Sequence, residues 1–302
     1  MSLYGRIFIK NCTKSDAMRD AGLTIPEDIE YVRDIPYGDN LKCQTLDICF
    51  PKKNGLAVGN EDALGWRLPV IVSVHGGGYV YGNTKVYQFY CASLAERGFA
   101  VVNYNYRLAP KYKFPAPLED LDLVLHWMAS KDCYDKYPVD VQNVFIVGDS
   151  AGGQIASQYG AIYSNEEYRK LFGFKLPDIK LKGLGINCGS MDFKTSVEKE
   201  GNRGFLRDYI GKNPIQFGDM LDVNKYVTSN YPPTHIMSSK GDFMLPFAEP
   251  IYDFLKGKGV KTECKIYGDE NIGHVFHVNV KLDIGKQAND DQTEFFKGYI
   301  GE

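Results

Sequence analysis

The stretch VFIVGDSAGGQIASQYG, residues 144–160, decides both the fold and the chemistry that this sequence predicts. An apolar run typical of a buried strand leads through a glycine-rich turn into a helix-like segment, and Ser150 stands at the turn between Gly148 and Gly152. A GxSxG pentapeptide between a strand and a helix predicts a nucleophile elbow, because small neighbours leave room for the crossing backbone. We therefore expect the Ser150 hydroxyl to lie exposed at the carboxyl edge of a sheet, beside the first amides of the next helix.

Length and composition indicate one α/β domain spanning residues 1–302. The chain is 44% hydrophobic and 13% aromatic, which suffices for a large core. Its formal net charge is −3, and acidic and basic residues are mixed along its length. No basic field for nucleic acid or anionic lipid is visible, so a small neutral ligand is favoured. The sequence leaves open whether the protein forms a homodimer.

Seven cysteines are spread along the chain without a CxxC pair or a His/Cys cluster. Neither a disulfide framework nor a zinc site is indicated, and unpaired cysteines suit a reducing compartment. The N-terminus lacks the apolar core and cleavage site of a secretory signal, and no run approaches the roughly 18 apolar residues of a membrane span. We expect a cytoplasmic protein with no membrane partner, no metal and no cofactor.

Strand-like and helix-like segments alternate along most of the chain, which predicts a mainly parallel sheet with helices on both faces. The expected strands are residues 68–75, 99–106, 144–148, 184–189, 234–242 and 262–268. Helices are expected around Leu121–Met128, from its i, i+3, i+4, i+7 apolar spacing, and over 249–259. The alternating stretch CQTLDICF, residues 43–50, suits an edge strand stopped by Pro51.

Two segments do not follow this alternation: residues 1 to about 36, and residues 190 to about 233. Inserts of this kind usually sit over the ligand end of an open sheet, so we expect both to form a small cap. Residues 52–65 are expected to form a long surface hairpin or loop.

A serine nucleophile needs a base, and the chain has five histidines. His274 follows Gly273 in a segment after the last expected strand, where the base belongs when the chain order is serine, acid, histidine. His277, three residues further on, remains the alternative. His126 and His235 are expected to be structural, and His75 is expected to order the loop in which it lies.

The third member must be a carboxylate that holds the imidazole in the correct tautomer. Asp242 ends the segment THIMSSKGD at the sheet edge and is the preferred candidate. Asp269 and Glu270 lie closer to His274 in sequence and remain alternatives, although a solvated turn also explains them.

The segment HGGGY, residues 75–79, follows a predicted strand and offers backbone amides free of side chains. A tetrahedral oxyanion needs such donors. We expect Gly77, Gly78 and the amide of Ala151 to form an oxyanion hole, with Tyr79 contacting the substrate. Phe205 and Tyr209 are candidates for the walls of an acyl pocket.

These motifs, HGGG, YRLAPKYKFPAPLED, GDSAGG and then Asp242 and His274 in order, resemble the hormone-sensitive-lipase-like esterase branch of the α/β-hydrolase superfamily. The resemblance covers roughly residues 65–280. It implies a serine carboxylesterase with the triad Ser150, Asp242 and His274 and no metal or cofactor. Arg107 and Pro110 match a structural element of that family.

Two segments depart from the family pattern: GDFML lacks the usual Asp-Pro-Leu, and GHVFHV differs from His-Gly-Phe. The stretch at residues 31–51 resembles the strand leading into the sheet of bacterial carbohydrate and feruloyl esterases. The sequence shows many candidate pocket walls and no obvious apolar lid helix, which favours short to medium acyl esters, and the second resemblance implies acetyl or aromatic acyl groups on carbohydrate as one form. A non-catalytic small-molecule binder and an amide or formamide hydrolase with the same triad remain alternatives.

Overall fold

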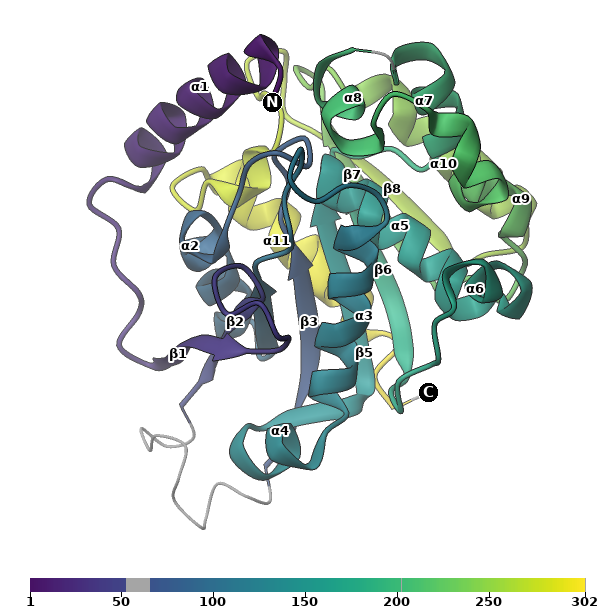
Figure 1. Cartoon of the computed structure of the whole chain (residues 1–302). Coiled ribbons are helices and arrows are strands. Elements are labelled where there is room, and N and C mark those ends of the chain that lie inside the picture. Colours follow the sequence, from purple (N-terminus) through teal and green to yellow (C-terminus); the bar gives the residue numbers. More distant parts are fainter. Residues whose placement is uncertain (53–65, 202, 302) are drawn as a thin grey trace.

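An eight-stranded sheet forms the centre of the part of the chain that this computed structural model describes, residues 1–52, 66–201 and 203–301 (Figure 1). The strand order is β1-β2-β4-β3-β5-β6-β7-β8; β1–β2 and β2–β4 are antiparallel, and all later neighbours are parallel. The strands are β1 (Ile29–Pro36), β2 (Thr45–Pro51), β3 (Leu68–Val74), β4 (Ala100–Tyr104), β5 (Val139–Asp149), β6 (Leu181–Asn187), β7 (Thr234–Ser239) and β8 (Thr262–Tyr267). The mainly parallel sheet predicted from the sequence is confirmed.

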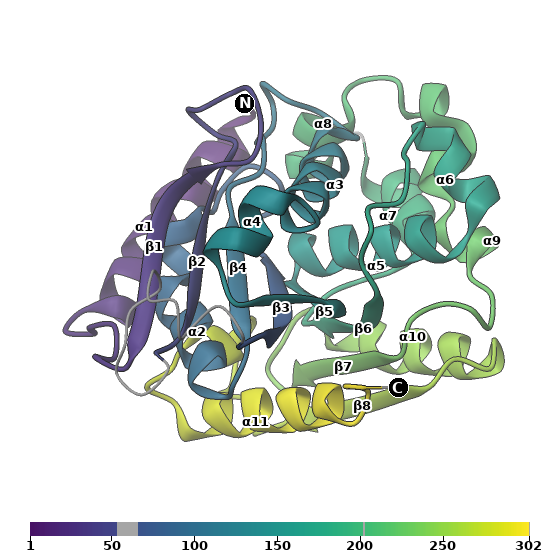
Figure 2. The same ribbon diagram turned by 90° about the horizontal axis from the view of Figure 1, so that it is seen from below.

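Both faces of the sheet are buried, because successive strand side chains point to opposite sides and each side is apolar. In β3, Val70 and Val72 belong to one core cluster and Ile71 to the other. Helices α2 (Thr84–Glu96) and α11 (Asp283–Lys297) supply residues to the cluster of Ile71. Helices α3 (Ala116–Met128), α5 (Ala151–Ser164) and α10 (Leu245–Gly257) supply residues to the other (Figure 2).

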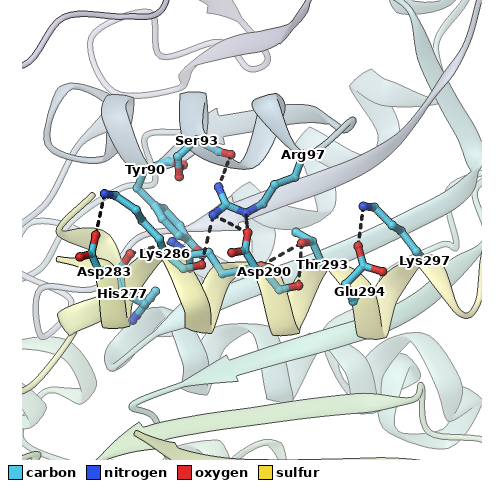
Figure 3. Close-up of polar contacts among 11 residues, drawn as sticks. Tyr90, Ser93, Arg97, His277, Asp283, Lys286, Asp290, Thr293, Glu294 and Lys297 are labelled. Atoms are coloured by element: carbon cyan, nitrogen blue, oxygen red, sulfur yellow. Dashed lines mark hydrogen bonds and ion pairs between the residues drawn. The ribbon is translucent and has the colours of Figure 1, made fainter. Parts of the chain in front are cut away.

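Helices α2 and α11 are also joined by polar contacts, which Figure 3 shows in close-up. The Arg97 guanidinium donates to the Asp290 carboxylate at 2.8 Å, to the Ser93 carbonyl at 2.6 Å and to the Lys286 carbonyl at 3.1 Å. The bonds to Asp290 and Lys286 therefore join the C-terminal end of α2 to α11.

The remaining helices are shorter or lie outside the two covering layers. They are α1 (Leu3–Asp20), α4 (Lys131–Lys136), α6 (Glu166–Phe172), α7 (Phe193–Glu200), α8 (Gly204–Ile210), α9 (Val223–Tyr226) and the 3-10 helices η2 (Pro214–Leu221) and η3 (Phe276–Val278). Figure 1 shows α1, α7 and α8 together at the top of the molecule, the end toward which the arrow of β3 points.

The structure corrects two expectations at the N-terminal end. Residues 29–36, expected to lie in the cap up to about residue 36, form the edge strand β1. Thr45–Pro51 is therefore the second strand and not the edge, with Val32 paired to Ile48. Most of β1 is partly exposed, so its sequence lacks the apolar run by which a buried strand is recognised. The loop expected over 52–65 lies, apart from Lys52, outside the described residues.

Candidate active site

Ser150 lies at the turn that joins β5 to α5, in a strained backbone conformation with φ 53° and ψ −117°. Close contacts explain the flanking glycines: a Cβ at Gly148 would meet the Gly152 carbonyl oxygen at 2.2 Å, and one at Gly152 would meet the Val74 carbonyl oxygen at 2.0 Å. A non-glycine residue in this region costs free energy and persists where the surroundings enforce it. The turn brings Ser150 to the wall of a cavity of about 900 Å³.

His274 lines the same cavity, and its Nδ1 lies 2.7 Å from Oδ1 of Asp242. The Asp242 carboxylate also accepts from the Ser238 hydroxyl at 2.9 Å and from the Met244 amide at 2.8 Å. Burial alone would raise the pKa of Asp242, but the hydrogen bond and charge of His274 and the Met244 amide lower it to about 2. Asp242 is therefore ionised at neutral pH and orients the imidazole so that Nε2 is left for a substrate or nucleophile.

The loop that carries His274 is held against the turn that carries Asp242. The Ser239 hydroxyl donates to the carbonyls of Ile272 at 2.7 Å and Gly273 at 3.0 Å. The amide of Gly241 donates to the Ile272 carbonyl at 3.1 Å. These bonds join the end of β7 to the loop after β8, which explains how residues 32 positions apart come to share one hydrogen bond.

The alternative acids are placed elsewhere: Asp269 and Glu270 are exposed in the turn after β8. His277 is also separated from the cavity, because its ring is buried edge-on to Tyr90 of α2 with centroids 5.3 Å apart (Figure 3). Burial lowers the pKa of His277 to about 3, and within the described residues neither ring nitrogen has a hydrogen-bond partner. His277 is thus an uncharged, packed residue.

The other three histidines are also outside the Asp242 pair. His75 is buried, stacks on Tyr106 at 4.0 Å, and its Nδ1 lies 2.7 Å from the Gly76 carbonyl. Burial lowers the pKa of His75 to about 4, so the ring is neutral. His235 is buried in β7, and His126 is exposed on α3.

The loop after β3 carries the glycines expected to bind an oxyanion, and both line the cavity with Ser150 and Ala151. Gly77 has φ 110°, and a Cβ there would meet the Tyr81 carbonyl oxygen at 2.3 Å. Gly78 has φ 59°, and a Cβ there would meet the ring of Phe205 at 3.1 Å. Only glycine suits the conformation and the space at Gly77.

Tyr87 of α2 connects this loop to the elbow. Its hydroxyl accepts from the Gly76 amide at 2.9 Å and donates to Oδ2 of Asp149 at 2.8 Å. Asp149 is fully buried next to Ser150, and burial raises the pKa of its carboxyl to about 6 although the Tyr87 hydrogen bond opposes the change. The two backbone segments expected to act together are therefore joined through one buried phenol.

The cavity wall includes Tyr79 and Phe205, as expected from the sequence. The expectation for Tyr209 is wrong: its ring is buried behind Tyr79, on which it stacks at 4.0 Å, and it does not reach the cavity. Helix α1 contributes Phe8 and Arg19 to the wall, so the N-terminal segment lines the same cavity as Ser150. Arg107, assigned to the fold, forms ion pairs with Asp120 and Glu119 at 2.8 and 2.7 Å.

Cys188 adds a thiol to the Asp242–His274 pair, and the potential ligand atoms of the three residues lie within 4.8 Å of one another. A metal would require the thiolate, but burial and the neighbouring Asp242 charge raise the pKa of Cys188 well above its usual value. The carboxylate and imidazole are already bonded to each other. The cluster therefore has the chemistry of an acid–imidazole pair with a protonated thiol beside it.

Comparison with known proteins identifies the family. Residues 71–278 match the family described as alpha/beta hydrolase fold, which is more than half of the chain. The chain belongs to the α/β-hydrolase fold family. The fold predicted from the elbow, and the resemblance to the hormone-sensitive-lipase-like esterase branch of this superfamily, are confirmed.

Several curated proteins resemble parts of this α/β-hydrolase. Arylacetamide deacetylase of Oryctolagus cuniculus is 38% identical over 112 residues, which are 36% of this chain and 26% of the relative. Carboxylesterase 20 of Arabidopsis thaliana is 33% identical over 132 residues, covering 42% of this chain and 39% of the relative. Probable carboxylesterase 8 of the same plant is 24% identical over 237 residues, covering 67% and 69%. The first two matches thus span well under half of those relatives.

Solved structures share the fold over nearly the whole chain. Esterase B from Lactobacillus rhamnosis superposes with a TM-score of 0.85 and 22% identity, covering 98% of this chain and 95% of the other. The hyperthermophilic esterase from the archaeon Pyrobaculum calidifontis gives 0.72 and 24%, covering 99% and 91%. At such identities the likeness establishes the α/β-hydrolase fold alone.

Sequence reasoning missed Tyr87 and Phe243 in this α/β-hydrolase site. Tyr87 lies within an ordinary amphipathic helix pattern, and nothing in the sequence marks its hydroxyl as a partner of Asp149. Phe243 had a signal, because it directly follows the acid candidate Asp242, at the place of the proline in the Asp-Pro-Leu that often marks this position in the family. Within the described residues, no helix has the length and apolar character that crossing a membrane requires.

Proposed function

We propose that this α/β-hydrolase is a carboxylesterase that hydrolyses small-molecule esters through an acyl-enzyme on Ser150. The observation that carries the proposal is the 2.7 Å contact between His274 and Asp242, on a histidine that lines one cavity with Ser150, Gly77 and Gly78. A nucleophile, an oriented base and a set of amides around one space are the requirements of acyl transfer. Membership of an esterase-rich family supports the same activity.

The mechanism follows from the roles of these groups. Nε2 of His274 takes the Ser150 proton as the hydroxyl oxygen attacks the ester carbonyl, and Asp242 stabilises the imidazolium. The amides of Gly77, Gly78 and Ala151 bind the oxyanion, and removal of one such donor typically costs roughly 3 to 4 kcal/mol. His274 then gives the proton to the leaving alcohol. A water molecule repeats the sequence on the acyl-enzyme and releases the acid.

The acyl group is short to medium in length, with acetyl or aromatic acyl groups on carbohydrate as one form. In this proposal the cap over Ser150 consists of α1 and parts of the segment after β6, which is supported by residues of both that line the cavity together with Tyr79 and Phe205. Unpaired cysteines at all seven positions are compatible with a cytoplasmic location.

Amide hydrolysis is a second candidate, favoured by the similarity to proteins named arylacetamide deacetylase. The same groups would act, with His274 giving its proton to a leaving amine. Turnover of phenyl acetate and acetanilide by the same preparation separates the two activities. A non-catalytic binder would turn over neither compound.

The test of the proposal is Ser150→Ala, assayed with p-nitrophenyl acetate. Turnover should fall to the background rate while the circular dichroism spectrum and melting temperature stay native. Ser164→Ala is the matched control, because Ser164 lies on the same helix with its hydroxyl bonded to the Gly160 carbonyl and does not line the cavity. Near-native turnover by Ser150→Ala would refute the elbow assignment.

A further inference from the structure

Phe243 is an exposed aromatic residue beside the proposed base. It follows Asp242 directly, and 70% of its surface is exposed. Its ring lies against the imidazole of His274, with centroids 4.3 Å apart and planes inclined by 42°. An exposed aromatic ring next to the base is available to pack against an apolar part of a ligand.

Phe243 does not contribute to the packing of the hydrophobic core. It precedes helix α10, which begins at Leu245, and it belongs to none of the buried core clusters of the described residues. The Asp242 carboxylate is held by the Met244 amide and the Ser238 hydroxyl, neither of which needs a phenyl group at residue 243. The position is also where this chain departs from the Asp-Pro-Leu pattern.

The ring faces the cavity and continues into an apolar wall. Phe243 lines the cavity together with Pro246, Phe247, Pro250 and Phe254, which come from α10. Phe247 is itself 39% exposed. An apolar part of a ligand that passes His274 therefore meets aromatic and proline side chains.

The proposed chemistry decides which half of an ester meets Phe243. His274 gives its proton to the leaving alcohol, so the alcohol oxygen must come within hydrogen-bond reach of Nε2. Nδ1 is occupied by Asp242. The carbon atoms attached to that oxygen then lie beside the imidazole, against which the Phe243 ring packs. The acyl carbon stays bonded to Ser150 and has no such constraint.

We propose that Phe243 is a specificity-determining residue for the alcohol part of the substrate and selects esters of aromatic or bulky apolar alcohols. This inference rests on the proposed esterase function. The ring stacks against the alcohol while it is bound and as it departs, and aromatic pairs prefer such tilted or offset arrangements. The contact exists in both the bound ester and the transition state, so its main effect is on KM.

The experiment compares acetate esters of ethanol, cyclohexanol, benzyl alcohol and 1-naphthol for the wild type and Phe243→Ala. The acyl group is constant, and intrinsic differences in reactivity cancel in the ratio of variant to wild type. We expect the preference for benzyl over ethyl acetate, as a ratio of kcat/KM, to fall about tenfold, which corresponds to about 1.4 kcal/mol. Phe243→Tyr keeps the ring and should restore the preference.

Two controls fix the interpretation. Ethyl esters from acetate to hexanoate vary only the acyl group, and Phe243→Ala should not alter that profile. Leu176→Ala removes another exposed apolar side chain, 45% exposed and outside the cavity, and should leave the alcohol preference unchanged.

The outcomes separate the inference from the function on which it rests. If Ser150→Ala abolishes turnover but Phe243→Ala lowers all four acetate esters equally, Phe243 only shields the base and the inference is wrong. A changed acyl profile with an unchanged alcohol profile would assign Phe243 to the other half of the ester and also overturn it. Full turnover by Ser150→Ala would instead remove the proposed function.

Discussion

The stability of the variant Asp149→Asn, relative to that of the wild type, should increase as the pH rises from acidic to neutral. The Asp149 carboxyl is fully buried, and burial raises its pKa from the ordinary 3.8 to about 6 against the opposing hydrogen bond from Tyr87. The folded protein thus binds this proton more tightly than the unfolded chain does. Stability from that proton is complete below about pH 4 and is lost as the pH rises through 6.

The expected size follows from the displacement of about two pH units, which corresponds to about 3 kcal/mol. Asparagine at position 149 has no proton to lose, so the free energy of unfolding of the variant minus that of the wild type should increase by about this amount from pH 4 to pH 7.5. Urea denaturation at five pH values measures the difference, and the pH dependence of other groups cancels.

A second variant tests the cause. Tyr87→Phe removes the hydroxyl that donates to Asp149 at 2.8 Å, so the pKa of Asp149 should rise and the pH-dependent loss of wild-type stability should move to higher pH. If the free energy of unfolding of Asp149→Asn and that of the wild type change with pH by the same amount across this range, the reasoning is refuted. That result would mean that the buried carboxyl has an ordinary pKa.

Three further predictions address the proposed chemistry. Asp242→Asn should lower kcat for p-nitrophenyl acetate by about 10⁴, as expected when the imidazole loses its correct tautomer, and an effect below about tenfold would contradict the assignment. Gly77→Ala should lower kcat by about a hundredfold or more, because its Cβ would meet the Tyr81 carbonyl at 2.3 Å and displace an oxyanion donor. Gly173→Ala is its control, because Gly173 also has a positive φ of 70° but a Cβ built there has nothing within 4 Å. This variant should keep full activity. His277→Ala should lower the melting temperature but change kcat far less than His274→Ala, whereas equal losses would leave the base unassigned.

The sequence predicted the sheet because the sheet depends on local patterns repeated in order, and the same patterns singled out Asp242 and His274, which lie 2.7 Å apart. Apolar runs separated by helix-like segments fix a parallel sheet, and the carboxyl ends of such strands gather at one edge. A residue that closely follows a strand, such as Asp242 in the turn after β7, can therefore be expected at the same edge of the sheet as Ser150 without knowing any distance.

The features that the sequence did not predict depend on contacts between residues far apart in the chain, or on how much of a strand is exposed to solvent. Strand β1 is half exposed, so its apolar pattern is weak even though Val32 pairs with Ile48. Tyr209 was expected at the cavity because it is aromatic, but stacking on Tyr79 buries it. An aromatic residue in a cap segment can face either the core or the cavity, and only tertiary packing decides which.

Identification of the residue that carries the acyl group tests the central claim most directly. The protein should be quenched in acid during turnover of p-nitrophenyl butyrate, or treated with a phosphonate ester, and digested for peptide mass spectrometry. We predict one added group on Ser150, and no labelled peptide from Ser150→Ala. Continued ester turnover with no modification at Ser150, or with the group on another side chain, would contradict the account.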